Sequence, residues 1–406
     1  MKKLSPEEVG LWGTGKTIII AEFSDCRYDA RINREADSLA KIGFRIEVFM
    51  YNEGIKFHEK MQKGRILYHQ FPFPGRRKNK SFCQKIQRKL TMLRFLLWGN
   101  YKVLTTKADI IHAHNLYFLF SSWLASELRE IPLVYDAHEL HGEDLPGNNI
   151  KNRIRSFIVK KYERFFSRKA TAIFTVNEAI AEKIAVKLKT DKPFVLHNYT
   201  PYDPKVCDYS LQKEAGLAEN IKIIYFSGGI YSAKSRRLDL IINVLPDLPA
   251  NIHFIVIGMM NESIREELFL HARNLKVENR FQILPSRPTY ELIIAGACAD
   301  MGVIPFAGDI PNHTLSSPNK ISEYLMAGLP VIATDYPIIK NQIESDPLGE
   351  AGKCFDINSA ESIKSAILYI LDNKERLSVN ARKLAKVRYN WETQEKILTD
   401  AYKNLI

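Results

Sequence analysis

The chain has 406 residues, of which 46% are hydrophobic and 26% charged, a composition typical of folded globular proteins that excludes wholesale disorder. This length predicts roughly two or three domains, each large enough to bury a hydrophobic core. The five cysteines are scattered and form no CxxC pair, which argues against a disulfide framework or a zinc cluster and favours a reducing, cytoplasmic location.

The net charge of +12 comes from the first half of the chain. Residues 1–200 contain 35 lysines and arginines against 21 aspartates and glutamates. Such an excess attracts nucleic acid, anionic lipid or acidic substrates, and charge alone does not choose among them. The longest stretch without Asp, Glu, Lys or Arg, residues 110–126, has 17 residues and includes two histidines, so no transmembrane helix is expected. The N-terminus shows no secretory signal.

Short β-branched segments alternate with longer amphipathic ones along the chain. In the first half a helix is expected at 30–43, and strands are expected at 17–23, 45–51, 108–114, 131–138 and 171–177. Residues 197–210, rich in Pro, Tyr, Asp and Asn, indicate a linker. Strands are expected again at 221–229, 251–258, 279–285, 300–306 and 329–335, and a helical tail at 381–406.

This rhythm predicts an α/β protein with two doubly wound, Rossmann-like parallel-sheet domains facing each other across a cleft. The expected domains are residues 1–200 and 201–385, followed by a C-terminal helix at 386–406.

Near the start, Gly10, Gly15, Lys16 and Thr17 match the spacing GxxxxGK[ST] of a phosphate-binding loop. That loop works between a strand and a following helix. Here a strand is expected to follow Thr17, so we interpret the segment as a lead-in to the first strand.

The most informative segment is SSPNKISEYLMAGLPVIATD, Ser316–Asp335. Ser317 is expected to cap a helix that starts at Pro318, and Gly328 is expected to end it. The free N–H groups at the start of such a helix attract anions. This segment therefore predicts an anion site at the helix start.

A carboxylate and a glycine pair extend this prediction to a nucleotide site. Asn319 and Glu323 lie four residues apart on one helix face, where Glu323 can accept hydrogen bonds from the two ribose hydroxyls. Gly228 and Gly229 end a predicted strand, and Arg236 follows at the expected start of the next helix, where a guanidinium suits a pyrophosphate. Singly, these features are more often a solvated helix face and a turn. Together, on successive loops of one domain, they favour a nucleotide site.

These residues resemble a known family. SPNKISEYLMAGLPVIATD and FSGGIYSAKSRRLDLII are similar to the nucleotide-binding signature and the donor phosphate loop of retaining GT-B glycosyltransferases of the family 4-like group, which includes many bacterial polysaccharide enzymes. DARINREADSLAKIGFRIEVF, ADIIHAHN and IPLVYDAHEL fall where this group has landmarks of its acceptor domain. The resemblance extends over nearly the whole chain and implies two facing Rossmann-like domains, with a closing helix that crosses back onto the first.

The resemblance also implies roles for individual residues. Its donor site maps onto Gly228, Gly229, Arg236, Ser317, Asn319, Lys320 and Glu323. His138 is placed beside the donor sugar as the catalytic candidate, where it would bond a sugar hydroxyl or orient the acceptor. A satisfied core imidazole is the alternative for His138. The acceptor-side candidates are Asp29, Arg31, His114, Asn115 and Glu139.

Two departures from the family pattern affect the donor site. Leu315 stands where a first glutamate is common, and Ile230 stands where an arginine often follows the glycine of the phosphate loop. Lys320 and Arg236 are the candidates for the missing positive charge. With these groups facing the diphosphate, neither a metal nor another cofactor is expected.

Four histidines, His112, His114, His138 and His141, raise the question of a metal site. They are expected on separate strand ends without a matching Cys or Asp framework, so we do not predict a metal.

Residues 75–102 contain nine Lys and Arg and no acid, with Phe82, Ile86, Leu90, Leu93 and Leu97 at helical spacing. A basic amphipathic segment of this kind suits an anionic membrane surface. The alternative is that the apolar stripe packs on the domain core while the basic residues face water. A nucleic-acid partner is not expected, because no RNA-binding signature accompanies the charge.

Together these features predict a peripheral enzyme at the inner face of the membrane. It would be a metal-independent hexosyltransferase that moves a sugar from a nucleotide-diphosphate donor to a hydroxyl of a glycan or lipid-linked acceptor, with retention of anomeric configuration. The alternatives are a sugar-nucleotide epimerase and a catalytically silent GT-B scaffold that binds nucleotide or lipid.

Overall fold

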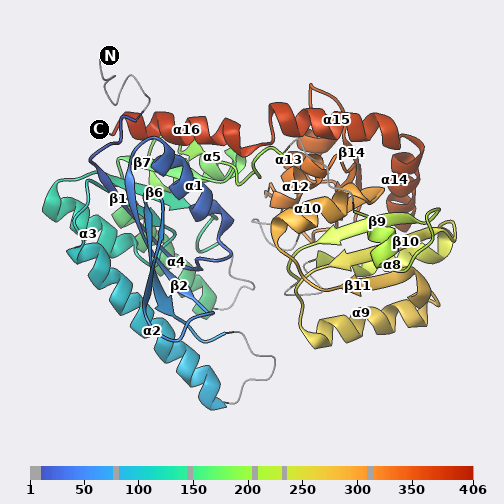
Figure 1. Cartoon of the computed structure of the whole chain (residues 1–406), viewed down its shortest axis with the longest axis horizontal. Helices are drawn as coiled ribbons and strands as arrows, with labels where there is room; N and C mark the ends of the chain where they lie inside the picture. Colours follow the sequence, from blue (N-terminus) through green and yellow to red (C-terminus); the bar gives the residue numbers. More distant parts are fainter. Residues whose placement is uncertain are drawn as a thin grey trace. The chain divides into compact units, whose positions relative to one another are not determined.

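The computed structural model describes residues 11–75, 82–143, 150–203, 209–230, 236–308, 314–315 and 317–405. The chain forms two compact units (Figure 1). Unit 1 comprises Met1–Asn198 and Gln394–Ile406, and unit 2 comprises Tyr199–Thr393. Each unit is built on its own sheet.

Unit 1 contains an eight-stranded sheet in the order β3-β4-β2-β1-β5-β6-β7-β8. Its neighbouring strands run parallel except β3 and β4, which pair antiparallel. The strands are β1 (Thr17–Asp25), β2 (Arg45–Asn52), β3 (Glu59–Lys63), β4 (Ile66–Pro72), β5 (Ile110–His114), β6 (Leu133–Ala137), β7 (Ala172–Thr175) and β8 (Phe194–Val195).

Helices cover both faces of this sheet. They are α1 (Ala30–Lys41), α2 (Phe82–Thr105), α3 (Leu119–Arg129), α4 (Ile150–Ser167), α5 (Glu178–Leu188) and α16 (Trp391–Lys403), of which the last enters unit 1 from Gln394 onward. His112 and His114 point to the face that α1 and α16 cover. Helices α2 and α3 lie on the opposite face, where Phe95 of α2 packs against Phe118 (Figure 1).

Unit 2 contains a six-stranded parallel sheet in the order β11-β10-β9-β12-β13-β14. The strands are β9 (Lys222–Ser227), β10 (Ile252–Ile257), β11 (Phe281–Leu284), β12 (Met301–Ile304), β13 (Val331–Thr334) and β14 (Gly352–Phe355). Alternate side chains of β9 enter two separate cores, because successive residues of a strand point to opposite faces. Ile224 and Phe226 belong to one core, and Ile223 and Tyr225 to the other.

The helices of unit 2 pack against these two cores. They are α6 (Leu211–Glu214), α8 (Asp239–Val244), α9 (Glu262–Asn274), α10 (Thr289–Ala297), α12 (Asn319–Ala327), α13 (Pro337–Ile343), α14 (Ala360–Asp372) and α15 (Lys374–Val387), with short 3₁₀ turns at Leu245–Asp247 and Glu278–Arg280.

Comparison with the sequence confirms the predicted fold class of two parallel-sheet α/β domains. Every strand expected from a β-branched segment is present, although most are shorter than the segment. The antiparallel β3–β4 pair was not predicted, and the expected single helical tail is two helices, α15 and α16, separated by residues 388–390. At the N-terminus, residues 12–15 form a turn and a strand, not a helix, follows from Thr17, as predicted; Gly10 lies outside the described residues.

Candidate functional sites in the two units

In unit 2, the start of α12 is fixed beside the end of β9. The backbone N–H of Ser227, the last residue of β9, donates to the hydroxyl of Tyr324 on α12 at 3.1 Å. The ring of Tyr324 fits because residue 302 is glycine: a Cβ there would lie 2.4 Å from that ring. This anchor places the first turn of α12 next to the glycine pair that follows β9.

Lys320, in the first turn of α12, faces Gly228. Gly228 has φ +104°, and a Cβ built on it would lie 2.8 Å from the Lys320 Nζ. The same amino group lies 5.1 Å from the centre of the Phe226 ring. Burial lowers the pKa of Lys320 to about 8; the nearby Arg236 also lowers it, whereas Glu323 raises it. The Lys320 amino group therefore lies against Gly228, in the space that a side chain at this position would need.

Arg236 completes this group of charges. Its guanidinium lies 4.3 Å from the centre of the Phe306 ring, after β12. Arg236 has helical backbone and precedes α8, which begins at Asp239. The structure thus brings Gly228, Lys320, Glu323 and Arg236 into one neighbourhood, with Gly229 next in the chain.

The predicted capping of α12 by Ser317 is wrong. The helix begins at Asn319, Pro318 occupies the N-cap position, and no side chain caps the helix. The Ser317 hydroxyl instead accepts a hydrogen bond from Gln342 Nε2 at 2.7 Å. Asn319 is exposed at the first helical position. The expected C-terminus is confirmed, since Gly328 ends α12 with φ +70°.

Ile230 and Leu315, the two departures from the family pattern, differ in burial. Ile230 is buried and its backbone pairs with the segment around Met259, so it contributes packing and no charge. Leu315 is partly buried.

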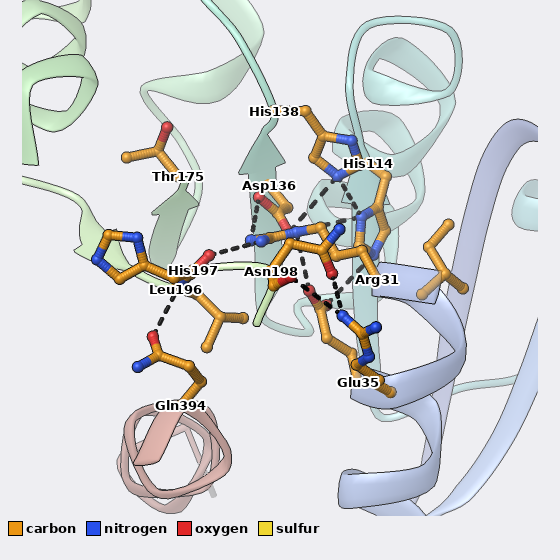
Figure 2. Close-up of polar contacts among 12 residues, drawn as sticks. Arg31, Glu35, His114, Asp136, His138, Thr175, Leu196, His197, Asn198 and Gln394 are labelled. Carbon is orange, nitrogen blue, oxygen red and sulfur yellow. Dashed lines mark hydrogen bonds and ion pairs between the residues drawn. The ribbon is translucent and has the colours of Figure 1, made fainter. Parts of the chain in front are cut away.

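In unit 1, a buried ion pair joins α1 to β6. Arg31 donates from Nε and Nη2 to the Asp136 carboxylate at 2.7 and 3.0 Å, and from Nη1 to the Leu196 carbonyl at 2.6 Å. Figure 2 shows Arg31, Asp136, His114 and His138 pointing toward one another. Burial opposes ionisation of Asp136, but the facing Arg31 holds the pKa of this carboxyl well below its usual range.

His138 follows β6 directly, as predicted, and is the partly exposed member of this group, with 24% of its side chain accessible. Its Nε2 lies 3.0 Å from His114 Nδ1 and 3.7 Å from Asp136 Oδ2. Its Nδ1 lies 3.1 Å from the amide nitrogen of Asn115. Although burial lowers the pKa of His138, Asp136 outweighs this effect and raises it. Both ring nitrogens therefore already have protein partners.

Asn115 links His138 to a second buried acid, Glu22 of β1. The Asn115 Nδ2 donates to Glu22 Oε2 at 3.1 Å. Burial raises the pKa of Glu22 to about 8, against the opposing influence of His138. This carboxyl lies beside the end of β5, one of the strand ends where open parallel sheets bind ligands.

Behind His138 lies a further buried carboxyl, Glu35. Its Oε2 is 3.6 Å from His114 Nε2 and 3.8 Å from His112 Nε2, and its Oε1 is 3.0 Å from Arg31 Nε. The expectation that the histidines lack an acidic framework was wrong, because Glu35 and Asp136 join His112 and His114 in one buried cluster.

Asp29 and Glu139 are the remaining candidates of unit 1. Asp29 caps α1 by accepting from the Ile32 N–H at 3.1 Å. Glu139 is exposed and lies 3.7 Å from His141 Nδ1. Of the acceptor-side candidates, the structure thus brings Arg31, His114 and Asn115 together with His138. Asp29 lies near enough to raise the pKa of Glu22, and Glu139 is exposed.

Four residues of this network were missed from the sequence: Glu22, Glu35, Asp136 and Tyr402. A usable signal existed for two of them, since Glu35 is four residues after Arg31 on a predicted helix and Asp136 interrupts an apolar strand. No local signal marks Tyr402, whose hydroxyl reaches His112 Nδ1 at 2.8 Å from the far end of the chain.

The basic amphipathic segment forms α2, whose apolar stripe faces outward. Phe82, Ile86, Leu90, Leu93 and Leu97 are between 42% and 77% exposed. The core side of α2 is made instead by Phe95, Gly99 and Val103. The alternative that the stripe packs on the core is therefore wrong; residues 76–81 of this segment lie outside the described residues.

Helix α4, like α2, combines basic residues with exposed apolar residues. It carries six Lys and Arg and one acid, Glu163, which is buried against Tyr135 and Lys187. Its exposed apolar residues are Ile150, Ile154, Phe157, Ile158 and Phe165. Among the described residues, no helix is both long enough and apolar enough to cross a bilayer.

Two sequence families match the two units in turn. Residues 28–198 match the glycosyl transferase 4-like domain, and residues 210–387 match the glycosyl transferases group 1. A similar characterised protein is D-inositol 3-phosphate glycosyltransferase of Corynebacterium glutamicum (strain R), which is 22% identical over 330 residues, covering 73% of this chain and 72% of that protein.

Solved structures show the same fold. Sucrose-phosphate synthase from Thermosynechococcus elongatus superposes with a TM-score of 0.72 at 13% identity, over 96% of this chain and 99% of its own. HepE from Anabaena, solved in complex with UDP, superposes with a TM-score of 0.66 at 15% identity, over 96% of this chain and 100% of its own. WaaG, a glycosyltransferase involved in lipopolysaccharide biosynthesis, superposes with a TM-score of 0.64 at 16% identity, over 95% of this chain and 99% of its own. The chain belongs to the GT-B glycosyltransferases.

Proposed function

We propose that this glycosyltransferase moves a hexosyl group from a nucleoside-diphosphate sugar to a hydroxyl of a glycan or lipid-linked acceptor, with retention of anomeric configuration and without a metal. The observation that carries the proposal is the position of the Lys320 amino group against Gly228, at the start of α12. The epimerase and the silent scaffold have no comparable observation in their favour.

The chemistry of the transfer explains why these charges suit the reaction. The bond between the anomeric carbon and the diphosphate oxygen breaks, its electron pair stays on the diphosphate, and a new bond forms to the acceptor oxygen. The transition state is oxocarbenium-like, so preorganised cations beside the departing oxygen are the main source of acceleration. Lys320 and Arg236 supply that charge from the protein, which is why no metal is proposed.

Comparison with neighbours supports the choice of donor. HepE has been solved with UDP and with UDP-glucose, and the characterised relative is named for transfer to D-inositol 3-phosphate. In this chain we assign the diphosphate to Gly228, Gly229, Lys320, Arg236 and the N-terminus of α12, with Ser317 and Asn319 flanking. Glu323, partly exposed one turn into α12, is assigned to the ribose hydroxyls.

On unit 1, we assign His138 to the reacting sugar or acceptor hydroxyl. It directly follows β6, at the edge of the sheet where open parallel sheets place ligands, and 24% of its side chain is accessible. Asn115 lies beside it, so a substrate hydroxyl would share or replace the contact of the Asn115 amide with His138 Nδ1.

The acceptor is proposed to be presented at an anionic membrane surface. Helix α2 combines exposed apolar residues with five Lys and Arg and no acid. Helix α4 combines exposed apolar residues with six Lys and Arg and one acid, which is buried. Apolar insertion together with attraction to anionic lipid is the usual basis of peripheral binding by such helices. A lipid-linked acceptor in polysaccharide or glycolipid biosynthesis fits this placement.

Two measurements test the proposal. Thermal unfolding in the presence of uridine, guanosine, adenosine and cytidine diphosphates should identify one that raises the melting temperature, because a ligand of the native state stabilises it. NMR of the first-formed product with the matching donor sugar should then show the anomeric configuration of the donor. Stabilisation by no nucleotide, or release of a free epimerised donor without an acceptor, would contradict the proposal.

A further inference from the structure

Unit 1 contains a pocket that none of the candidate site residues lines. It has a volume of about 410 Å³ and is formed by the segment after β2, by the end of β4 with the residues that follow it, and by the N-terminal half of α2. This volume falls within the range of about 300–1,000 Å³ that is typical of small-molecule sites. The pocket is therefore large enough to hold part of a substrate.

The pocket lies at the same edge of the sheet as His138. Strands β2 and β4 run parallel to β1, β5 and β6, so all five end at one edge, where open parallel sheets bind ligands. Between β2 and β6 there are three strand spacings, which together span about 14 Å. A molecule anchored in the pocket can therefore extend along this edge to His138, but its reacting hydroxyl lies outside the pocket.

The charged residues that line the pocket are two cations, without an acid. Lys56 and Arg94 are exposed, and neither has a hydrogen-bond or ion-pair partner among the described residues. A third cation nearby, Arg88, is already engaged, because it donates to the Pro74 carbonyl at 2.6 Å and pairs with Glu53 at 3.3 Å. Lys56 and Arg94 are thus the cations available to an anionic ligand. A phosphate carries enough charge and enough acceptor oxygens to engage both.

Aromatic side chains supply much of the remaining wall. The His58 ring packs edge-on against Phe71, with 4.6 Å between the ring centres. Burial lowers the pKa of His58 and the nearby Arg94 lowers it further, so this ring is neutral at pH 7. Phe57 adds a side chain that is 77% exposed. The pocket thus combines apolar walls with two cations, which suits an amphiphilic anion.

The pocket also adjoins the apolar stripe of α2. Three residues of α2 line the pocket and form one row on the helix surface, because they are four and three residues apart: Gln87, Thr91 and Arg94. Each is directly preceded by a residue of the stripe that is between 42% and 56% exposed: Ile86, Leu90 and Leu93. Since successive helix residues are about 100° apart, the stripe runs beside the pocket row. An apolar chain that leaves the pocket along α2 would therefore meet apolar side chains.

We propose that this pocket binds the phosphate of a lipid-linked acceptor, with Lys56 and Arg94 contacting the phosphate and the lipid chain lying along the apolar stripe of α2. The inference rests on the proposed transfer reaction, whose acceptor it specifies. The pocket holds the anchored end of the acceptor, and the glycan extends from it along the sheet edge to His138. A soluble sugar phosphate is the competing ligand, but it would leave the stripe without a partner.

Titration calorimetry with farnesyl phosphate, kept below its micellar concentration, tests the proposal. This probe carries both features that the pocket and the stripe would recognise. Farnesol lacks the phosphate and glucose 6-phosphate lacks the lipid chain, so each should bind about tenfold or more weakly than farnesyl phosphate.

A pair of double variants locates the binding. Lys56→Gln/Arg94→Gln should weaken the affinity for farnesyl phosphate about tenfold or more, because it removes both cations of the pocket. The matched control is Lys60→Gln/Lys85→Gln, which removes two exposed cations of β3 and α2 that do not line the pocket, and it should bind as the wild type does. All four residues are exposed, so neither double variant should disturb the fold.

Four results would overturn the inference. They are no binding of farnesyl phosphate, equally tight binding of farnesol or glucose 6-phosphate, undiminished binding by the pocket variant, and an equal loss in the two double variants, which would indicate unspecific attraction to the basic surface. The titrations need neither a donor nor turnover. If they fail while a nucleotide still stabilises the protein, the proposed transfer reaction stands and only the assignment of its acceptor falls.

Discussion

Arg31 and Asp136, which are 105 residues apart in the sequence, form a two-bond ion pair in the interior of unit 1, with 4% and 0% of their side chains exposed. The pair ties α1 to β6, the strand that directly precedes His138.

Asp136→Asn should therefore destabilise the protein strongly. The change leaves the Arg31 charge buried without its main counter-ion, and breaking such a pair costs about 3–5 kcal/mol. The exposed pair of Lys63 with Asp37 is the control, since Asp37→Asn should cost less than about 1 kcal/mol. The free energy of unfolding in urea checks both, and equal effects of the two changes would contradict the assignment.

The sequence predicts much of the fold because short runs of β-branched residues mark the buried strands of both sheets. The β-branched run of Ile18, Ile19 and Ile20 is a buried strand, and Gly328 ends α12 where a glycine stop is expected. The β3–β4 pair escaped prediction because Glu59–Lys63 is polar and exposed along its length, so it shows no apolar alternation.

The candidate sites were predicted less completely than the fold, because some of their contacts join segments that are far apart in the sequence. Lys320 and Gly228 lie on sequence motifs, and the structure places them side by side. Ser317 was expected to cap α12, but Gln342, 25 residues away, donates a hydrogen bond to its hydroxyl. The contact between Glu35 and His114 depends on how α1 packs on the sheet, which no local pattern encodes.

The stability of unit 1 should depend on the ionisation of Glu22. Burial raises its pKa to about 8 in the folded protein, whereas the unfolded carboxyl titrates near its ordinary value of 4.5. The native state thus retains a proton that the unfolded state releases, so stability is lost as pH rises from 4.5 through 8. Between pH 6 and 9 this loss amounts to about 3 kcal/mol.

Glu22→Gln removes this titration and keeps an oxygen for the Asn115 amide. Urea unfolding at the two pH values should show a smaller alkaline loss in the variant than in the wild type. An identical pH dependence of the two proteins would contradict the assignment.

Gly228→Ala should weaken nucleotide binding more than it weakens the fold. The added Cβ would lie 2.8 Å from Lys320 Nζ and displace that amino group, at a backbone cost of about 1 kcal/mol for φ +104°. Gly216→Ala is the matched control, with φ +67° and no atom within 4 Å of its Cβ. Titration calorimetry with the stabilising diphosphate should show weaker binding in the first variant only; equal affinities would count against the site.

Helix α2 should bind anionic vesicles through its exposed apolar stripe. Replacing Leu93 and Leu97 by glutamate should reduce sedimentation with phosphatidylglycerol vesicles at low salt at least tenfold, because it removes apolar insertion and adds repulsion. Val186→Glu, an 80% exposed position on α5, is the control and should bind as the wild type does. The membrane proposal fails if the wild type stays in the supernatant.

The most direct test of the donor site is the affinity of a nucleoside diphosphate for Lys320→Met, measured by titration calorimetry. Methionine removes a buried charge whose pKa burial lowers to about 8, so the variant should be at least as stable as the wild type. Lys340→Met, which removes an exposed lysine paired with Asp335, is the control. The account predicts affinity reduced at least tenfold in Lys320→Met and unchanged in Lys340→Met; undiminished binding by Lys320→Met would contradict it.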